Sequence, residues 1–225
     1  MWTLGLISWM YDRDLGPTIA YLEGKFAKKL PEVAKANVAA LKAGHAFGET
    51  AEMPDDVRGF TIKPADFAPG VYRTVTGTEA TSWGLVAGAQ LAGLKIALCS
   101  YPITPASGIL HVLSRLKAYD VTTFQAEDEI AAVCAAIGAS YGGALGVTSS
   151  SGPGIALKTE AIGLAIASEL PLIVVNTQRA GPSTGMPTKT EQSDLYLAAY
   201  GRNADAPLIV LAAHSSADSF DVAIE

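Results

Sequence analysis

The chain has 225 residues, of which 49% are hydrophobic and 17% are charged, and its formal net charge is −6. This length fits one large domain, or one domain with an accessory piece, and the apolar fraction predicts extensive burial. The charge balance is acidic, and the sequence has no Lys/Arg run interleaved with aromatic residues. We therefore expect no nucleic-acid partner.

The sequence contains two cysteines, Cys99 and Cys134, and neither lies in a paired ligand spacing. A tetrahedral zinc site or an iron–sulfur cluster needs more ligands than this, so we expect the chain to hold no metal site by itself. We expect both thiols to be buried, in a reducing compartment.

Residues 130–157 carry no charged side chain, as a membrane span would, but they contain several glycines and the break SSSGPG. This pattern favours a buried helix followed by a buried strand over a membrane segment. The N-terminus has no basic region ahead of an apolar core and a small-residue cleavage site, so it does not resemble a signal peptide. We expect a cytoplasmic protein with no membrane partner.

In chain order, the first predicted elements are two helices, over 17–30 and 31–44. Each has Pro at the first helical position, and the second is predicted to end at Gly44. The residues that follow are rich in Pro, Gly and charge and show no sustained period, which is typical of a linker. We therefore predict a helical N-terminal segment over 1–50, a linker over 51–73 and a larger domain over 74–225.

The larger domain opens with a predicted helix over 78–91 that stops at Gly93, after which strands and helices alternate. The predicted strands cover 95–100, 121–125, 144–150, 171–176 and 207–213, and the predicted helices cover 106–117, 128–138, 155–168, 190–200 and 217 onward. Short apolar runs that alternate with helices indicate a parallel sheet covered on both faces. The predicted fold class is α/β, with a doubly wound parallel sheet.

Ligands of such a sheet bind beyond the carboxyl ends of the strands, and the unusual residues of this sequence follow predicted strands. After the first, Pro102 and Pro105 hold Thr104 in a stiff, non-helical arch. A plain turn into a helix, with Thr104 or Ser107 as its cap, is the alternative. The acidic triplet 127–129 follows the second strand.

The structural explanation of that triplet is a helix start, where carboxylates meet the helix dipole favourably. The functional explanation is one partly buried carboxylate with a raised pKa. SSSGPG at 149–154 follows the third strand and fits neither a phosphate loop nor a dinucleotide fingerprint, so it is either a tight turn or a close approach to a ligand. Arg179, after the fourth strand, is either solvated or a bidentate partner for a carboxylate or phosphate.

Four motifs, taken together, resemble the alpha subunit of 2-oxoacid:ferredoxin oxidoreductases, especially the 2-oxoglutarate type. They are YPITPAS (101–107), QAEDEIAA (125–132), TSSSGPG (148–154) and QRAGPSTGMPTKTEQSDL (178–195). The resemblance extends from about Thr74 to the end of the chain. Residues 1–50 resemble the tail of the gamma-type domain that is fused ahead of it in many such subunits.

The resemblance implies an enzyme that converts a 2-oxoacid, here 2-oxoglutarate, and coenzyme A to an acyl-CoA, here succinyl-CoA, and CO₂, with two electrons passed to ferredoxin. It implies that this chain supplies the pyrimidine-binding domain for thiamine diphosphate. A beta subunit would share the cofactor, bind its diphosphate with Mg²⁺ and carry a [4Fe-4S] cluster. The chain would be active only with that subunit and with the further domains of the family. Its pyrimidine-binding domain stops in a predicted helix at Glu225, so we expect part of this domain to be missing as well.

The resemblance also implies roles for single residues. Glu129 is the expected catalytic carboxylate that bonds the aminopyrimidine ring, because Gly138 lies nine residues on, as in the family pattern, whereas Glu127 would put it eleven away. Thr104 and Arg179 are the expected substrate-binding residues. The expected cofactor-binding residues are Pro102, Ile103, Gly152, Pro153 and Gly154.

Two pairs depart from the family pattern: Asn176-Thr177 stands where Asp-Val is more common, and Asn203-Ala204 where His-Gly is more common. The alternatives are a non-catalytic docking or assembly fragment of such a complex, or the same chemistry on another 2-oxoacid such as pyruvate. A related thiamine decarboxylase or acetolactate-type carboligase is a third, and the YPITP and Arg179 loops argue against it.

Overall fold

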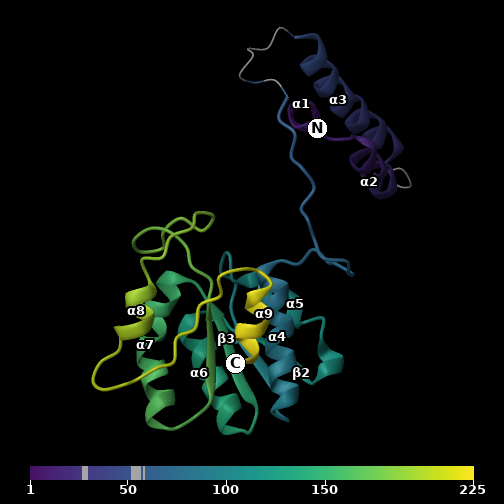
Figure 1. The fold of residues 1–225 in the computed structure, drawn as a ribbon. Helices are drawn as coiled ribbons and strands as arrows, with labels where there is room; N and C mark the ends of the chain where they lie inside the picture. The colour runs from purple at the N-terminus through teal and green to yellow at the C-terminus, as the bar shows by residue number, and fades with distance from the viewer. Residues whose placement is uncertain (27–29, 52–56, 58) are drawn as a thin grey trace. The chain divides into compact units, whose positions relative to one another are not determined.

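A computed structural model describes residues 1–26, 30–51, 57 and 59–225, and these form two compact units, Met1–Val71 and Tyr72–Glu225. Figure 1 shows the fold of each unit. Parts of the predicted linker, residues 52–56 and 58, lie outside the described residues. The assignment of 1–50 to a gamma-type domain stays a prediction.

The N-terminal unit consists of helices α1 (Trp2–Met10), α2 (Gly16–Phe26) and α3 (Pro31–Thr50). The sequence pattern missed α1, because this helix is apolar on nearly all sides and shows no helical period. The end of the predicted helix 17–30 includes residues 27–29, which lie outside the described part of the chain.

The prediction that α3 ends at Gly44 was wrong, because this glycine serves a helix crossing and not a helix end. A Cβ at Gly44 would overlap the Trp2 carbonyl group, and one at Gly5 would overlap the Leu41 carbonyl oxygen. The backbones of α1 and α3 therefore approach closely at these two positions, and α3 continues to Thr50.

The second unit is an α/β domain whose four strands are all parallel, in the order β2-β1-β3-β4. This confirms the predicted fold class. The elements in chain order are α4 (Gly77–Leu91), β1 (Ile96–Ser100), α5 (Ser107–Leu113), a 3-10 turn η2 (Lys117–Tyr119), β2 (Val121–Gln125), α6 (Glu129–Tyr141), β3 (Leu145–Ser150), α7 (Gly152–Ala167), β4 (Leu172–Asn176), α8 (Leu195–Tyr200) and α9 (Asp218–Ile224). Thr76 and Glu79 form a capping box that fixes the start of α4.

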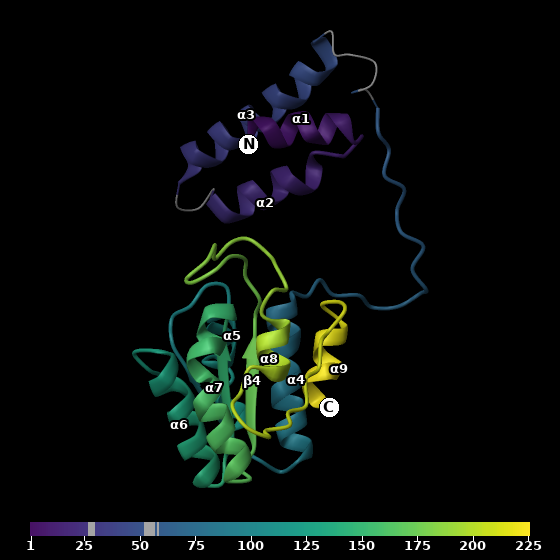
Figure 2. The ribbon, with the colours of Figure 1, turned by 90° about the vertical axis from the view of Figure 1, so that its left-hand side faces the viewer.

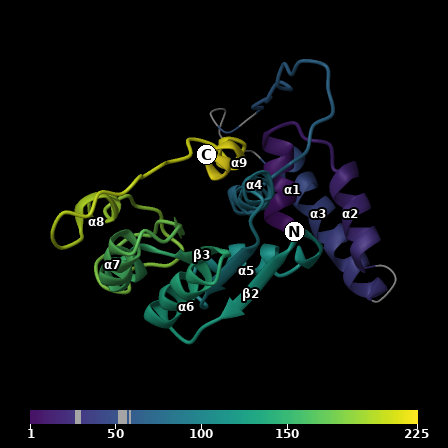
Figure 3. The same cartoon turned by 90° about the horizontal axis from the view of Figure 1, so that it is seen from below.

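Helices cover both faces of the sheet. Figures 2 and 3 show α6 and α7 on one face and α4 and α9 on the other. The larger core lies between the sheet and the helices α4 and α5, and it contains Leu85, Leu98, Leu113 and Val147. In the described residues no helix combines the length and the apolar composition that a membrane span requires.

The predicted fifth strand, 207–213, was wrong. The structure shows no strand there, and its apolar side chains are exposed, with Ile209 85% accessible. A strand needs a neighbouring strand to pair its backbone groups, and β4 pairs only with β3 among the described residues. An apolar run shows that a segment suits a sheet, but it does not show whether a partner lies beside it.

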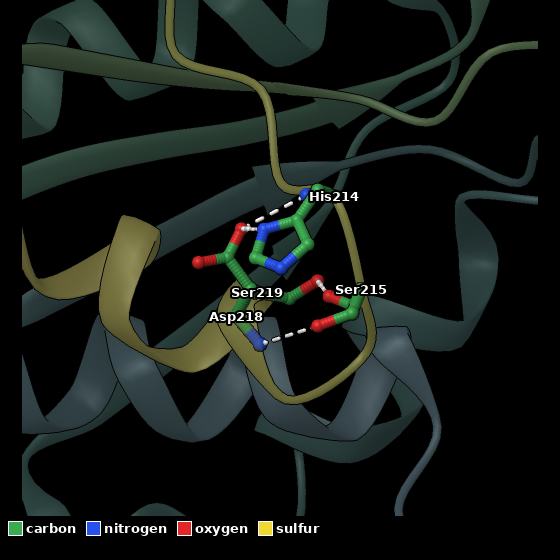
Figure 4. A network of polar contacts seen from close by, with 4 residues as sticks. All are labelled: His214, Ser215, Asp218 and Ser219. Carbon is green, nitrogen blue, oxygen red and sulfur yellow. Dashed lines mark hydrogen bonds and ion pairs between the residues drawn. The ribbon is translucent and has the colours of Figure 1, made fainter.

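The predicted helix 190–200 begins only at Leu195, as α8. The short helix α9 begins in a network of polar contacts that joins His214, Ser215, Asp218 and Ser219 (Figure 4). The His214 ring and backbone N–H both contact the Asp218 carboxylate, at 2.7 and 2.9 Å, and the Asp218 N–H donates to the Ser215 hydroxyl. The His214 backbone hydrogen bond is the main cause that lowers the pKa of Asp218. These contacts close the first turn of α9. No hydrogen bond joins the His214 imidazole to Ser215 or Ser219 among the described residues.

The packing of α6 on the sheet depends on Gly146 in β3. Its N–H donates to the Ser140 hydroxyl, and a Cβ there would overlap that hydroxyl and the Ala136 carbonyl oxygen. Gly138, on the same helix, is exposed, and no described atom lies within 4 Å of where its Cβ would be. Alanine substitution at Gly138 can therefore serve as the control for alanine substitution at Gly146.

We expect Gly146→Ala to lower the free energy of unfolding by about 1–3 kcal/mol, because α6 must move away from β3. Gly138→Ala should raise it by up to about 1 kcal/mol, because alanine is the better helix former. Urea unfolding of the purified chain measures both values. Equal stability of Gly146→Ala and the parent would contradict this description of the α6 contact.

Candidate active site

The carboxyl ends of β1 and β3 lie side by side, and buried serines join them. The Ser100 and Ser149 hydroxyl oxygens are 2.7 Å apart, and the Tyr101 hydroxyl is 2.8 Å from the Ser150 hydroxyl. All three serines are fully buried. Because β1 and β3 lead to β2 and β4 on opposite sides, this junction is the switch point at which parallel sheets bind ligands.

The loop after β1 is held by hydrogen bonds within the loop and by packing against the segment that leads from β2 into α6. Ile103 donates its N–H to the Ser107 hydroxyl (2.8 Å), which donates to the Ile103 carbonyl oxygen (3.0 Å). Tyr101 and Ile103 pack with Ala126, which precedes α6, and with Ala132 in the first turn of α6. Thr104 is exposed, and neither Thr104 nor Ser107 is the N-cap of α5, which is Ala106. The capping alternative is therefore wrong, and Ser107 braces the loop.

Arg179 is 8% exposed, so the description of it as a solvated loop residue is wrong. Its guanidinium donates to the carbonyl oxygen of Thr104 (2.8 Å) and to that of Thr184. Its Nε atom is buried and has no hydrogen-bond partner among the described residues. The structure thus brings Arg179 and the Thr104 loop together, from segments 75 residues apart in the chain.

Of the three acidic residues 127–129, only Glu129 is partly buried, and Glu127 and Asp128 are exposed. Asp128 is the N-cap of α6, and its side chain accepts the Ala131 N–H (2.8 Å). A Cβ at Gly154 would overlap the Ser150 and Tyr101 hydroxyls and lie 3.1 Å from Glu129 Cγ. Glu129 therefore lies against Gly154, while Asp128 does the structural work of the triplet.

Tyr101 is a site residue that sequence reasoning missed, although it begins the YPITP motif. Burial raises the pKa of its phenol, and so do a hydrogen bond to Glu129 and the negative charge of that residue. The Ser150 hydrogen bond and the nearby positive charge of Arg179 act in the opposite direction. Tyr101 therefore stays protonated and can donate to a carboxylate.

Lys158 was missed as well, and it is fully buried. Its ammonium donates to the Glu129 carbonyl oxygen (2.9 Å) and to the Thr148 hydroxyl (3.2 Å), and it lies 5.0 Å from the centre of the Tyr101 ring. Burial lowers the pKa of Lys158 to about 8, against the attraction of Glu129. The available signal was periodicity, since Lys158 shares the buried face of α7 with Ile155, Ala161 and Ile162.

Asp194, also missed, is the residue before α8, and it contacts the start of α7 in space. Its carboxylate accepts hydrogen bonds from Asn176 Nδ2 (2.7 Å) and from Gln178 Nε2. A Cβ at Gly152 would be 3.2 Å from Asp194 Oδ2, so the first residue of α7 touches this carboxylate. Two buried polar atoms nearby, Ser151 Oγ and Asn176 Oδ1, have no partner in the described part of the chain.

The two cysteines differ in their surroundings. Cys99 is buried as predicted, and burial raises the pKa of its thiol. Cys134 is exposed, so the prediction that it is buried was wrong: position 134 lies on the outer side of α6, with Ala131 and Gly138. Within the residues that the structure describes, no group of three or more His, Cys, Asp or Glu side chains could hold a metal ion.

The carboxyl edge of the sheet thus brings together a carboxylate packed against Gly154, an exposed threonine, a buried guanidinium and buried polar atoms that have no hydrogen-bond partner among the described residues. Residues 87–225 match the model of a protein family described as pyruvate flavodoxin/ferredoxin oxidoreductase, thiamine diphosphate-binding. The chain belongs to this family. The resemblance inferred from the four motifs is therefore confirmed.

Relatives of this family member include 2-oxoglutarate oxidoreductase subunit KorA of Mycobacterium tuberculosis, which is 58% identical over 225 residues. The match covers 100% of this chain and 34% of that protein. 2-Oxoglutarate synthase subunit KorA of Archaeoglobus fulgidus is 42% identical over 67% of this chain and 42% of the relative. The chain thus spans less than half the length of these curated relatives.

A solved structure with a similar fold is that of 2-oxoglutarate:ferredoxin oxidoreductase from Magnetococcus marinus with 2-oxoglutarate, coenzyme A and succinyl-CoA bound. It matches this family member with a TM-score of 0.78 and 36% identity. The match covers 99% of this chain and 38% of the other.

The contacts of Arg179 predict that it holds two loops in place. We expect Arg179→Met to speed amide hydrogen exchange in 101–106 and 180–186, because both carbonyl bonds are lost. Arg202→Met is the matched control, since Arg202 donates only to carbonyl oxygens between 198 and 206. Unchanged exchange in 101–106 of Arg179→Met would show that the loop does not depend on this residue.

Proposed function

We propose that this chain is the thiamine-binding part of the alpha subunit of a 2-oxoglutarate:ferredoxin oxidoreductase. The complete enzyme would convert 2-oxoglutarate and coenzyme A to succinyl-CoA and CO₂ and pass electrons to ferredoxin. The observation that carries the proposal is the position of Glu129 against Gly154 at the switch point. The names of the relatives support 2-oxoglutarate over pyruvate as the substrate.

The residues at the edge fit the aminopyrimidine part of thiamine diphosphate. This ring is flat and has hydrogen-bonding nitrogens, so it needs a carboxylate at its edge. Glu129 would supply the carboxylate, and Gly152, Pro153 and Gly154 form the turn that packs beside it. Ser151 Oγ at the same turn, which has no hydrogen-bond partner among the described residues, would bond to such a ring. Pro102 and Ile103 would bound the site from the loop after β1.

Thiamine diphosphate, when bound, supplies the electron sink that 2-oxoacid decarboxylation requires. Glu129 would hold a proton at the ring nitrogen, a role that contributes typically ~10²–10⁴-fold in rate for positioned acids and bases. The Thr104 hydroxyl and Arg179 Nε would orient the 2-oxoacid carboxylate. The other guanidinium nitrogens already bond to the two loop carbonyls, so Arg179 would bind the substrate as part of a rigid frame.

The proposed partner is a beta subunit that shares the cofactor, binds its diphosphate with Mg²⁺ and carries a [4Fe-4S] cluster from which ferredoxin takes electrons. Exposed apolar side chains support such a partner, because α6 and α7 present Ile130, Leu157 and Leu164 at about half exposure: 53%, 54% and 50%. The subunit names of the relatives agree with it. The cytoplasmic location stays a prediction.

The test is Glu129→Gln in the full-length alpha subunit, assembled with its beta subunit. We expect 2-oxoglutarate-dependent dye reduction to fall by about 10²-fold or more. Glu127→Gln removes a neighbouring exposed carboxylate and should leave the rate near that of the parent.

Near-normal turnover of Glu129→Gln would refute the assignment. Loss of activity in both variants would show that the effect is not specific to Glu129 and would also count against the assignment. Binding of the beta subunit by the parent alpha subunit, without any thiamine-dependent activity, would favour a non-catalytic docking role.

A further inference from the structure

Lys158 has no part in the proposed chemistry, yet it is the largest side chain that the structure buries completely. It lies on the inner face of α7 and reaches three other segments: Glu129 at the start of α6, Thr148 in β3 and the Tyr101 ring in the loop after β1. These are the segments that meet at Gly154.

Stability alone does not account for a lysine at this place. A buried charge is costly, and apolar side chains of similar volume often replace one without loss of stability. The start of a helix also carries a positive partial charge, which repels a cation. Lys158 is nevertheless bonded to the carbonyl group of the first residue of α6.

Glu129 is the main source of attraction for a cation at this position, and it offsets part of the effect of burial on the pKa of Lys158. The charged and titratable groups that face Lys158 are Glu129, Asp128 and Cys134 from α6 and Tyr101 from the loop after β1, and Glu129 exerts the strongest attraction. Thr148, the neighbour from β3, is neutral. The Lys158 ammonium thus contacts the backbone carbonyl of Glu129 and attracts the Glu129 carboxylate through its charge.

We propose that Lys158 is a positioning residue: its buried ammonium fixes the start of α6 and holds the Glu129 carboxylate, by attraction, in the orientation that meets the aminopyrimidine ring. This inference rests on the proposed role of Glu129. It does not require Lys158 to touch the substrate or the cofactor.

The test uses the full-length complex with three variants. Lys158→Met keeps the length of the side chain and removes the charge, Lys158→Arg keeps the charge, and Lys95→Met removes an exposed lysine at the other end of the sheet as the control. We expect Lys158→Met to lower kcat by roughly 10²-fold, the cost of misplacing a catalytic group, with the KM for 2-oxoglutarate little changed. Lys158→Arg should recover part of the loss, and Lys95→Met should match the parent.

The second readout is thiamine diphosphate binding to the assembled apo complex, measured by calorimetry against pH. Because the pKa of Lys158 is about 8, the parent keeps the charge below this pH and loses it above. The affinity of the parent should fall by roughly tenfold as the pH rises through about 8, one pKa unit of coupling, and that of Lys158→Met should not change there.

A pH-independent affinity of the parent through about 8 would overturn the inference, whether or not Lys158→Met assembles. Parent-like kcat in Lys158→Met would overturn it as well. The failure of the proposed function has a different result. If the proposed function is wrong, Glu129→Gln stays active. If only the role of Lys158 is wrong, Glu129→Gln is inactive and Lys158→Met has normal activity.

Discussion

The absence of a side chain at Gly154 is the constraint on which the rest of the site depends. Even a methyl group there would overlap the hydroxyls of Ser150 and Tyr101 and crowd Glu129. Three segments that are remote in sequence therefore share one point: the loop after β1, the end of β3 and the start of α6. Glycine is needed here for close approach, since the positive backbone φ angles of the chain lie elsewhere.

Around this point, buried charged side chains form hydrogen bonds that link the loops and helices that follow the strands. Lys158, Arg179 and Asp194 are the buried charged residues of the described chain. Each joins different segments through backbone or amide groups, and none is in an ion pair among the described residues. A buried charge that lost such partners would be strongly destabilising, so each loop has one defined position. This rigidity would let a chain supply half of a site whose other half comes from a partner.

The sequence predicted what depends on local pattern. Four apolar runs became the four strands, and the motifs after them lie at one edge because the carboxyl ends of parallel strands do. The N-cap role of Asp128 leaves Glu129 as the partly buried carboxylate of the triplet, and the catalytic role that the resemblance implies for Glu129 stays a prediction. Errors arose where the outcome depends on distant groups: residues 207–213 lack a strand beside them, and Gly44 meets another helix. Lys158 was missed although it shares the helical spacing of the buried face of α7. Lysine is rarely buried, and the acceptors that permit its burial lie in α6 and β3, far away in the sequence.

The central claim is that the Glu129 carboxylate, positioned by its contact with Gly154, receives the aminopyrimidine ring. The most direct measurement is the structure of the full-length alpha subunit with its beta subunit and thiamine diphosphate, read as the distance from the Glu129 carboxylate to the ring nitrogens. We expect a hydrogen bond of about 2.6–3.2 Å to one ring nitrogen. A ring bound against other residues, or a Glu129 carboxylate turned away from it, would contradict the account.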